Sequence, residues 1–149
     1  MEKEIITKTG DDTIKLGYRL AKLLKKGMTI TLDGDLGAGK TCFTKGIGKG
    51  LNIKKNITSP TFTILKIYQG DLPLYHFDAY RLEGVTQELG FDEYFDDDGI
   101  TVIEWPEFMT EFTLNEYLEI KVVILEDFSR SFTFIAHGAK YEQLLEELK

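Results

Sequence analysis

The sequence predicts a three-layer α/β fold with a mixed parallel and antiparallel sheet. A glycine-rich segment, Gly34 to Thr41, lies between an apolar, β-branched run and a stretch that can continue as a helix. Helical and strand-like segments alternate early in the chain, and later segments pair across short turns. The 149 residues contain no Pro/Ser-rich linker, repeat or low-complexity tract. We therefore expect residues 1–149 to form a single domain.

Two helices and two strands are expected in the first third of the chain. Glu4–Lys8 is typical of a short strand, and Met28–Asp33 of a buried one. Asp11 or Asp12 can cap a helix that runs to Lys26 and ends at Gly27. The phosphate-loop helix is expected from Cys42 to Leu51. The apolar stripe of the first helix consists of Ile14, Leu16, Leu20, Leu23 and Leu24.

Two antiparallel hairpins are expected later. The strands Phe62–Tyr68 and Leu72–Tyr80 are joined by the short turn Gln69-Gly70-Asp71. A second hairpin pairs Leu118–Leu125 with Ser131–His137. The other expected elements are a short helix at Thr86–Gly90, a strand at Ile100–Glu104 after the acidic loop Asp96–Gly99, and a short helix from Lys140.

The segment Gly34-Asp35-Leu36-Gly37-Ala38-Gly39-Lys40-Thr41 fits the phosphate-binding pattern G-x-x-x-x-G-K-S/T. Its glycines let successive backbone N–H groups point at a phosphate chain. Lys40 can reach the β- and γ-phosphates, and the Thr41 hydroxyl can bind Mg²⁺. The alternative is a chance glycine-rich turn, but the strand before it and the helix after it favour the motif. We predict a P-loop NTPase fold that binds a nucleoside triphosphate with Mg²⁺.

A site of this kind needs an acid at the end of a strand beside the phosphate-loop strand. Glu104 ends the apolar run Ile100–Glu104, and we assign it the metal-side role. Asp78 ends a second run and shares one strand face with His76. We interpret Asp78 as a second acid near the metal or as the group that orients the attacking water. A structural ion pair with Arg81 is the alternative, and His76 is expected to be a hydrogen-bonded structural residue.

Bulk composition restricts the function classes. The formal net charge of −7 argues against a protein that binds nucleic acid through bulk electrostatics, and no binding to DNA is expected. Residues 36–70 nevertheless contain six lysines and no acid, which indicates either phosphate binding and a solvated helix face or a positive surface for an acidic partner or RNA. There is no membrane-length apolar run and no signal-peptide character, so a cytoplasmic location is expected. Cys42 is the only cysteine and is expected to be small and buried.

Four motifs together resemble the TsaE (YjeE) family of bacterial P-loop ATPases. They are the phosphate loop, Thr58-Ser59-Pro60-Thr61-Phe62, His76-Phe77-Asp78-Ala79-Tyr80-Arg81-Leu82 and Glu104-Trp105-Pro106-Glu107. The resemblance implies a Mg²⁺-dependent ATPase that works with the TsaD and TsaB proteins in making threonylcarbamoyladenosine in tRNA. Contact with tRNA is then expected only indirectly, through that complex.

Site residues follow from the resemblance by position. Leu36, Gly37, Ala38, Gly39, Lys40 and Thr41 would hold the phosphates of ATP, and Thr41 and Glu104 would face Mg²⁺. Asp78 would be needed for hydrolysis, with Lys40 and Glu104 as its catalytic companions. Gly10, Thr13 and Arg130 are the expected matches to the adenine pocket. The segment Thr58–Phe62 is interpreted as a switch that changes shape after hydrolysis, although an ordinary turn before a strand fits its spacing equally well.

A phosphate loop is also found in proteins with three other functions. A small-molecule kinase usually closes an arginine-rich lid over the transferred phosphate, whereas this chain has only three widely spaced arginines. A GTP switch usually carries an N-K-x-D segment for guanine, and the sequence has none. A nucleotide-gated adaptor, in which binding matters more than turnover, stays compatible with the sequence.

Overall fold

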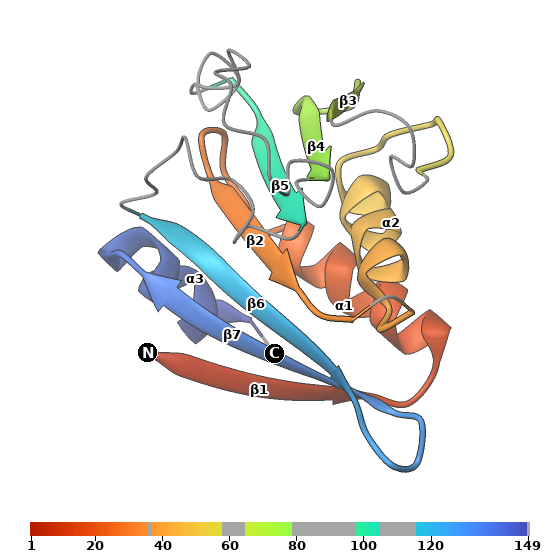
Figure 1. The fold of residues 1–149 in the computed structure, drawn as a ribbon. Coiled ribbons are helices and arrows are strands. Elements are labelled where there is room, and N and C mark those ends of the chain that lie inside the picture. Colours follow the sequence, from red (N-terminus) through yellow and green to blue (C-terminus); the bar gives the residue numbers. More distant parts are fainter. Residues whose placement is uncertain (36, 58–64, 79–97, 105–115, 149) are drawn as a thin grey trace, which may run out of the picture.

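A seven-stranded mixed sheet organises the molecule (Figure 1). The computed structural model describes residues 1–35, 37–57, 65–78, 98–104 and 116–148. The strand order is β1-β7-β6-β2-β5-β4-β3. The strands are β1 (Glu2–Thr7), β2 (Thr29–Asp33), β3 (Leu65–Tyr68), β4 (Leu74–Asp78), β5 (Ile100–Glu104), β6 (Tyr117–Ile124) and β7 (Arg130–His137). The helices are α1 (Gly10–Ala21), α2 (Lys40–Gly50) and α3 (Ala139–Glu147).

Parallel pairing at the centre of the sheet gives way to antiparallel pairing at both edges. β2 pairs in parallel with both β5 and β6, and β4 pairs in parallel with β5. The β3–β4 and β6–β7 pairs are antiparallel, so both predicted hairpins are confirmed. β1 joins antiparallel to β7 at the outer edge. The predicted mixed sheet is confirmed, while the helix expected at Thr86–Gly90 lies outside the described residues.

The boundaries of α1 differ from the prediction at both ends. Thr9 is the N-cap, because its hydroxyl accepts a hydrogen bond from the Asp12 N–H at 3.1 Å. Asp11 and Asp12 lie instead in the first turn, where negative charge is favourable beside the helix N-terminus. The helix ends at Ala21 rather than at Lys26. Gly27 adopts φ +89° in the connection to β2, which explains the glycine without making it the helix end.

α1 and α2 cross with their backbones in contact. A Cβ built on Gly46 would lie 2.0 Å from the carbonyl oxygen of Ile14, and one on Gly17 would lie 2.2 Å from that of Phe43. Any larger residue at either position would force α1 and α2 apart. Because α1 packs so closely on α2, it helps to fix the helix that follows the phosphate loop.

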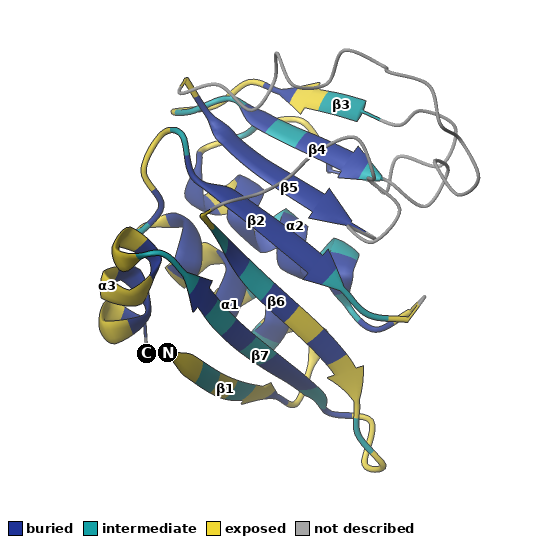
Figure 2. Cartoon of the chain, turned by 60° about the vertical axis from the view of Figure 1, so that its left-hand side comes forward, coloured by how far each residue is buried: buried dark blue, intermediate teal, exposed yellow. Residues whose placement is uncertain are grey.

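The described helices cover one face of the sheet. Phe43 of α2 packs on the rings of Phe132 and Phe134 of β7. Lys3 lies opposite Phe134, so its side chain is on the same face, and its ammonium donates to the carbonyls of Leu145 and Leu148 at the end of the chain. α3 therefore packs on the same side as α2. Figure 2 shows the central strands β2 and β5 buried along their length, while residues of the edge strand β1 alternate in exposure.

No described helix combines the length and the apolar character needed to cross a bilayer.

Candidate active site

The phosphate loop follows directly from the end of β2. Gly37 and Gly39 have φ values of +81° and +102°, which side-chain-bearing residues rarely adopt. Gly39 is the N-cap of α2, and Lys40 is its first helical residue. The Ala38 N–H donates to the Asp35 carbonyl at 3.0 Å, which closes the turn. The loop therefore leads into a helix N-terminus, where backbone N–H groups favour an anion; Leu36 lies outside the described residues.

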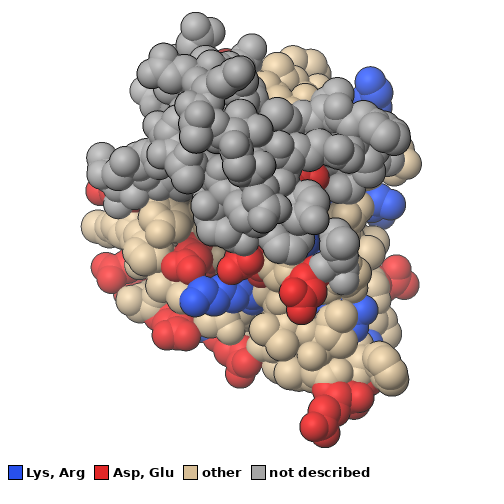
Figure 3. Space-filling model, viewed as in Figure 1, with Lys and Arg blue, Asp and Glu red and all other residues tan. Residues whose placement is uncertain are grey.

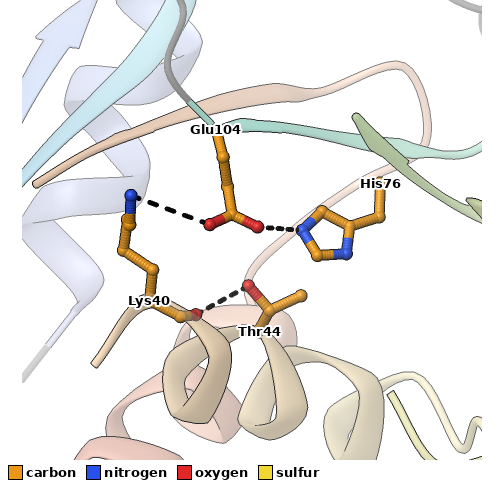
Figure 4. Close-up of polar contacts among 4 residues, drawn as sticks. All are labelled: Lys40, Thr44, His76 and Glu104. Carbon is orange, nitrogen blue, oxygen red and sulfur yellow. Dashed lines mark hydrogen bonds and ion pairs between the residues drawn. The ribbon is translucent and has the colours of Figure 1, made fainter. Parts of the chain in front are cut away.

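Lys40 faces a buried carboxylate across the sheet end. Its ammonium lies 3.9 Å from Glu104 Oε1, and each side chain is only 5% exposed (Figure 4). Glu104 is the last residue of β5 and is in register with Leu32 of β2. The phosphate-loop lysine and an acid on the neighbouring parallel strand are thus brought together, as the apolar run ending in Glu104 predicted.

His76 holds the other oxygen of the same carboxylate. His76 Nε2 and Glu104 Oε2 are 2.5 Å apart, and the histidine is fully buried. Figure 4 shows the Glu104 carboxylate between the two partners, with Lys40 coming from α2 and His76 from β4. The Thr44 hydroxyl donates to the Lys40 carbonyl at 2.9 Å within the first turns of α2. The interpretation of His76 as a hydrogen-bonded residue is confirmed, whereas its partner could not be read from the sequence.

Asp78 lies beside Glu104 at the end of the next strand. The two residues are paired in the β4–β5 register, so both carboxylates come from the same edge of the sheet as the phosphate loop. Asp78 and Thr41 are half-buried, which leaves each partly open to solvent. Arg81, the alternative partner for Asp78, lies outside the described residues. The whole of the predicted switch segment, Thr58–Phe62, also lies outside the described residues.

The residues expected to contact adenine line one small cavity of about 100 Å³. Gly10 and Thr13 of α1 form one wall, and Arg130 at the start of β7 forms another. The Arg130 guanidinium donates to the carbonyls of Phe128 and Gly37 at 2.5 and 3.4 Å. It thereby links the β6–β7 turn to the phosphate loop. The cavity is also lined by Lys8, Thr9, Gly39, Cys42 and Phe128.

Two lining residues differ from the sequence-based expectations. Cys42 is half-buried rather than buried, because it lies in the first turn of α2 and faces Gly10.

Phe128 is the lining residue that the sequence analysis did not identify, although it is 79% exposed at the cavity edge. It adopts φ +66° in a turn where the Asp127 carboxylate accepts from the Ser129 N–H and hydroxyl. The hydrogen bonds from Ser129 lower the pKa of Asp127. The sequence Asp127-Phe128-Ser129 was the available signal for this turn.

Comparison with known proteins decides the family. Residues 7–132 match the family described as "Threonylcarbamoyl adenosine biosynthesis protein TsaE". The chain belongs to the TsaE family. A Bacillus subtilis relative is named tRNA threonylcarbamoyladenosine biosynthesis protein TsaE. It is 46% identical to this chain, and the match spans 93% of this chain and 88% of the relative. A Treponema pallidum relative of the same name is 41% identical over 86% of this chain and 96% of its own.

A solved structure matches as well. The crystal structure of Bacillus subtilis YdiB superposes with a TM-score of 0.83 at 41% identity, over 99% of this chain and 94% of that chain. This agreement confirms the predicted P-loop fold with a mixed sheet. The relatives' shared name places the TsaE family in the biosynthesis of threonylcarbamoyladenosine in tRNA.

Thr41 and Glu104 carry oxygen donors of the kind that Mg²⁺ takes. Among the described residues, no group of three or more His, Cys, Asp or Glu side chains is placed to hold a metal ion. Mg²⁺ keeps several waters and typically takes one or two protein oxygens plus phosphate oxygens. The half-buried Thr41 hydroxyl and the Glu104 carboxylate offer such a sparse set of hard oxygen donors. Thr41 and Glu104 are the residues that would face the ion.

Proposed function

We propose that this chain is a Mg²⁺-dependent ATPase of the tRNA threonylcarbamoyladenosine (adenosine 37) modification machinery. In this proposal it binds the TsaD and TsaB proteins and hydrolyses ATP to support their cycle. The observation that carries the proposal is the buried contact between Lys40 of the phosphate loop and Glu104 of the adjacent parallel strand. A lysine and a carboxylate in these positions match the parts that P-loop NTPases use around a triphosphate and its metal.

In the site without nucleotide, the contact with Glu104 positions Lys40 beside the phosphate loop. A lysine buried without a partner would favour its neutral form, because burial penalises the charge. Glu104 supplies the negative counter-charge for this buried ammonium beside the loop. A triphosphate carries more negative charge than one carboxylate and offers oxygens in reach of the loop N–H groups. We propose that Lys40 turns from Glu104 to the phosphates when ATP binds.

Hydrolysis needs an oriented water and stabilised charge at the transferred phosphoryl group. Bound Mg²⁺ would supply charge neutralisation on the phosphate oxygens. Glu104 is held on its second oxygen by His76, so it keeps its place when Lys40 leaves. Asp78, one strand further along, is the residue we propose to orient the attacking water. Gly10, Thr13 and Arg130 would enclose the adenine in the adjacent cavity.

An adaptor function, in which ATP binding rather than turnover controls a partner, shares the same site. Slow hydrolysis by the chain alone and faster hydrolysis with the partners would make the two descriptions equivalent.

Phosphate release from ATP tests the proposal directly. It is measured with the chain alone and then with a purified TsaD–TsaB pair added, each with Mg²⁺ and with excess EDTA. We expect Mg²⁺-dependent release that the pair stimulates. Release unchanged by the pair would contradict the partner assignment. Consumption of ATP only when a small-molecule acceptor is present would assign the chain to the kinases.

A further inference from the structure

A cavity of about 370 Å³ lies beside the later turns of α2, separate from the residues that line the adenine cavity. Its lining combines side chains of α1, α2 and the connection after α2. Four of the lining residues are lysines, and none is acidic: Lys45, Lys49, Lys54 and Lys55. Figure 3 shows basic side chains at several points along the margin that α2 occupies in Figure 1, with an acidic group between them, whereas acidic side chains predominate over the β6–β7 side.

The positive charge of this cavity is not neutralised within the described part of the chain. None of the four lysines forms an ion pair with a described acid. The surrounding sequence also lacks acidic residues, since residues 36–70 contain no Asp or Glu. The whole chain has a formal charge of −7, so this cavity is a local exception to an acidic molecule. Such a local reversal of charge is typical of a surface that receives an acidic ligand.

The floor of the cavity is apolar and fixed. Ile14, Ile53 and Ile57 contribute to the lining between the lysines. A Cβ on Gly48 would lie 2.2 Å from Ile57 Cδ1, so this loop residue sits directly on the α2 backbone. Ile57 is buried, whereas Lys54 and Lys55 are exposed at the rim. The cavity therefore offers an apolar contact surrounded by cationic groups.

We propose that this basic cavity is a docking site for an acidic, amphipathic segment of a partner protein. An apolar side chain of that segment would cover the isoleucines, and its carboxylates would pair with the lysines. Single-stranded RNA fits less well, because its recognition relies on stacking on aromatic rings or arginine planes. The described lining residues include neither an aromatic residue nor an arginine. The proposal does not depend on ATP hydrolysis.

Fluorescence anisotropy with defined probes tests this proposal. The first probe is a fluorescein-labelled amphipathic peptide of glutamate and leucine, roughly 12 residues long. A glutamate-only peptide and an oligouridylate of the same length are the comparators. We expect the amphipathic peptide to bind at least about fivefold more tightly than either comparator, with an affinity that falls as salt is added. Tighter binding of the oligouridylate, or failure of the amphipathic peptide to bind, would overturn the proposal.

Charge-reversal pairs locate the binding. The Lys54→Glu/Lys55→Glu pair changes exposed side chains and should weaken peptide binding at least about tenfold. Lys45→Glu/Lys49→Glu is a second pair in the same cavity, and circular dichroism shows whether each variant is folded. Lys25→Glu/Lys26→Glu is the matched control, because it changes charge equally in a different cavity. Equal loss in the control would overturn the site.

Two further results would also contradict the assignment. Displacement of the peptide by ATP would mean that these lysines belong to the nucleotide site instead. Concentration-dependent self-association that the Lys54→Glu/Lys55→Glu pair abolishes would identify a second copy of this acidic chain as the occupant. Sedimentation velocity on the free chain distinguishes that outcome.

Discussion

His76 Nε2 and Glu104 Oε2 lie 2.5 Å apart, and the opposite oxygen of the same carboxylate faces Lys40 Nζ at 3.9 Å. The shorter contact ties Glu104 to β4, whereas the longer one joins it to the first residue of α2. The carboxylate thus has one close, buried partner and one partner at the limit of an ion pair. In the proposed function, this difference between the two contacts would let Lys40 exchange Glu104 for a phosphate while Glu104 stays in place.

Lys40→Ala should weaken ATP binding by about 10- to 100-fold, which corresponds to the loss of a charged hydrogen-bonding group worth about 1.5–3 kcal/mol. Isothermal titration calorimetry with ATP and Mg²⁺ measures the change. Lys45→Ala is the control, since Lys45 lies on the same helix but lines the other cavity. ATP affinity that is equal in Lys40→Ala and wild type would remove Lys40 from the phosphate site.

The Glu104→Gln variant should keep most of the affinity for ATP and lose about 100-fold or more in turnover. The reason is that a neutral amide would not supply the negative charge that the carboxylate would place beside bound Mg²⁺. Single-turnover phosphate release separates this effect from binding. Glu119→Gln is the matched control, since Glu119 pairs with His137 on the β6–β7 hairpin. Turnover lost equally in both variants would point to a loss of folding instead of chemistry.

Asp78→Ala should also bind ATP, with turnover at least about 100-fold below wild type if Asp78 orients the attacking water. Asp98→Ala removes another carboxylate, one that accepts from the Tyr75 hydroxyl, and should hydrolyse ATP normally. Phosphate release at saturating ATP compares the two variants. Equal hydrolysis by Asp78→Ala and wild type would eliminate the proposed function of Asp78.

The part of the fold that follows from local pattern was predictable. The phosphate loop, the apolar run that ends in Glu104 and the two hairpins all depend on neighbouring residues, and each is where the sequence indicated. Glu104 could be chosen because a parallel strand beside the phosphate-loop strand must end at the same edge of the sheet. That inference needs only the knowledge that the two strands run in the same direction.

What the sequence did not reveal depends on distant partners or on competition between adjacent residues. The bond between His76 and Glu104 joins residues 28 positions apart, and nothing local to either one indicates it. Thr9 was passed over as the N-cap because Asp11 and Asp12 are equally good capping residues, and only the backbone geometry separates them. Phe128 is exposed in a turn, where an aromatic residue has no periodic pattern to reveal it.

Phe128→Ala should weaken ATP binding by about 3- to 10-fold, the range expected for losing one aromatic contact. Binding of inorganic tripolyphosphate should not change, because the side chain lines the cavity proposed for adenine and is not part of the phosphate loop. Competition of each ligand against a fluorescent ATP analogue gives both affinities. Equal weakening of ATP and tripolyphosphate would instead indicate that the Phe128 side chain supports the turn whose backbone carbonyl accepts from Arg130, and through Arg130 the phosphate loop.

Tyr141→Phe should lower the free energy of unfolding by about 1–3 kcal/mol at neutral pH, since the buried Thr29 N–H would lose its acceptor. In the folded chain the Tyr141 hydroxyl accepts that N–H at 2.8 Å, and the side chain is 1% exposed. Urea unfolding followed by circular dichroism measures the difference.

The same tyrosine predicts a loss of stability in alkali. Burial raises the pKa of Tyr141, so the folded chain holds this proton more tightly than the unfolded chain does. Its contribution is complete below the unfolded tyrosine pKa of about 10 and is lost as the pH rises toward the folded value. Between about pH 9 and pH 11, wild type should therefore lose more unfolding free energy than Tyr141→Phe, which has no proton to release there. Tyr117→Phe is a second test, because burial and then the charge of Glu119 raise the pKa of Tyr117 as well. This variant should likewise lose less unfolding free energy in alkali than wild type. Equal alkaline losses in wild type and Tyr141→Phe would show that Tyr141 is not the group that limits stability at high pH.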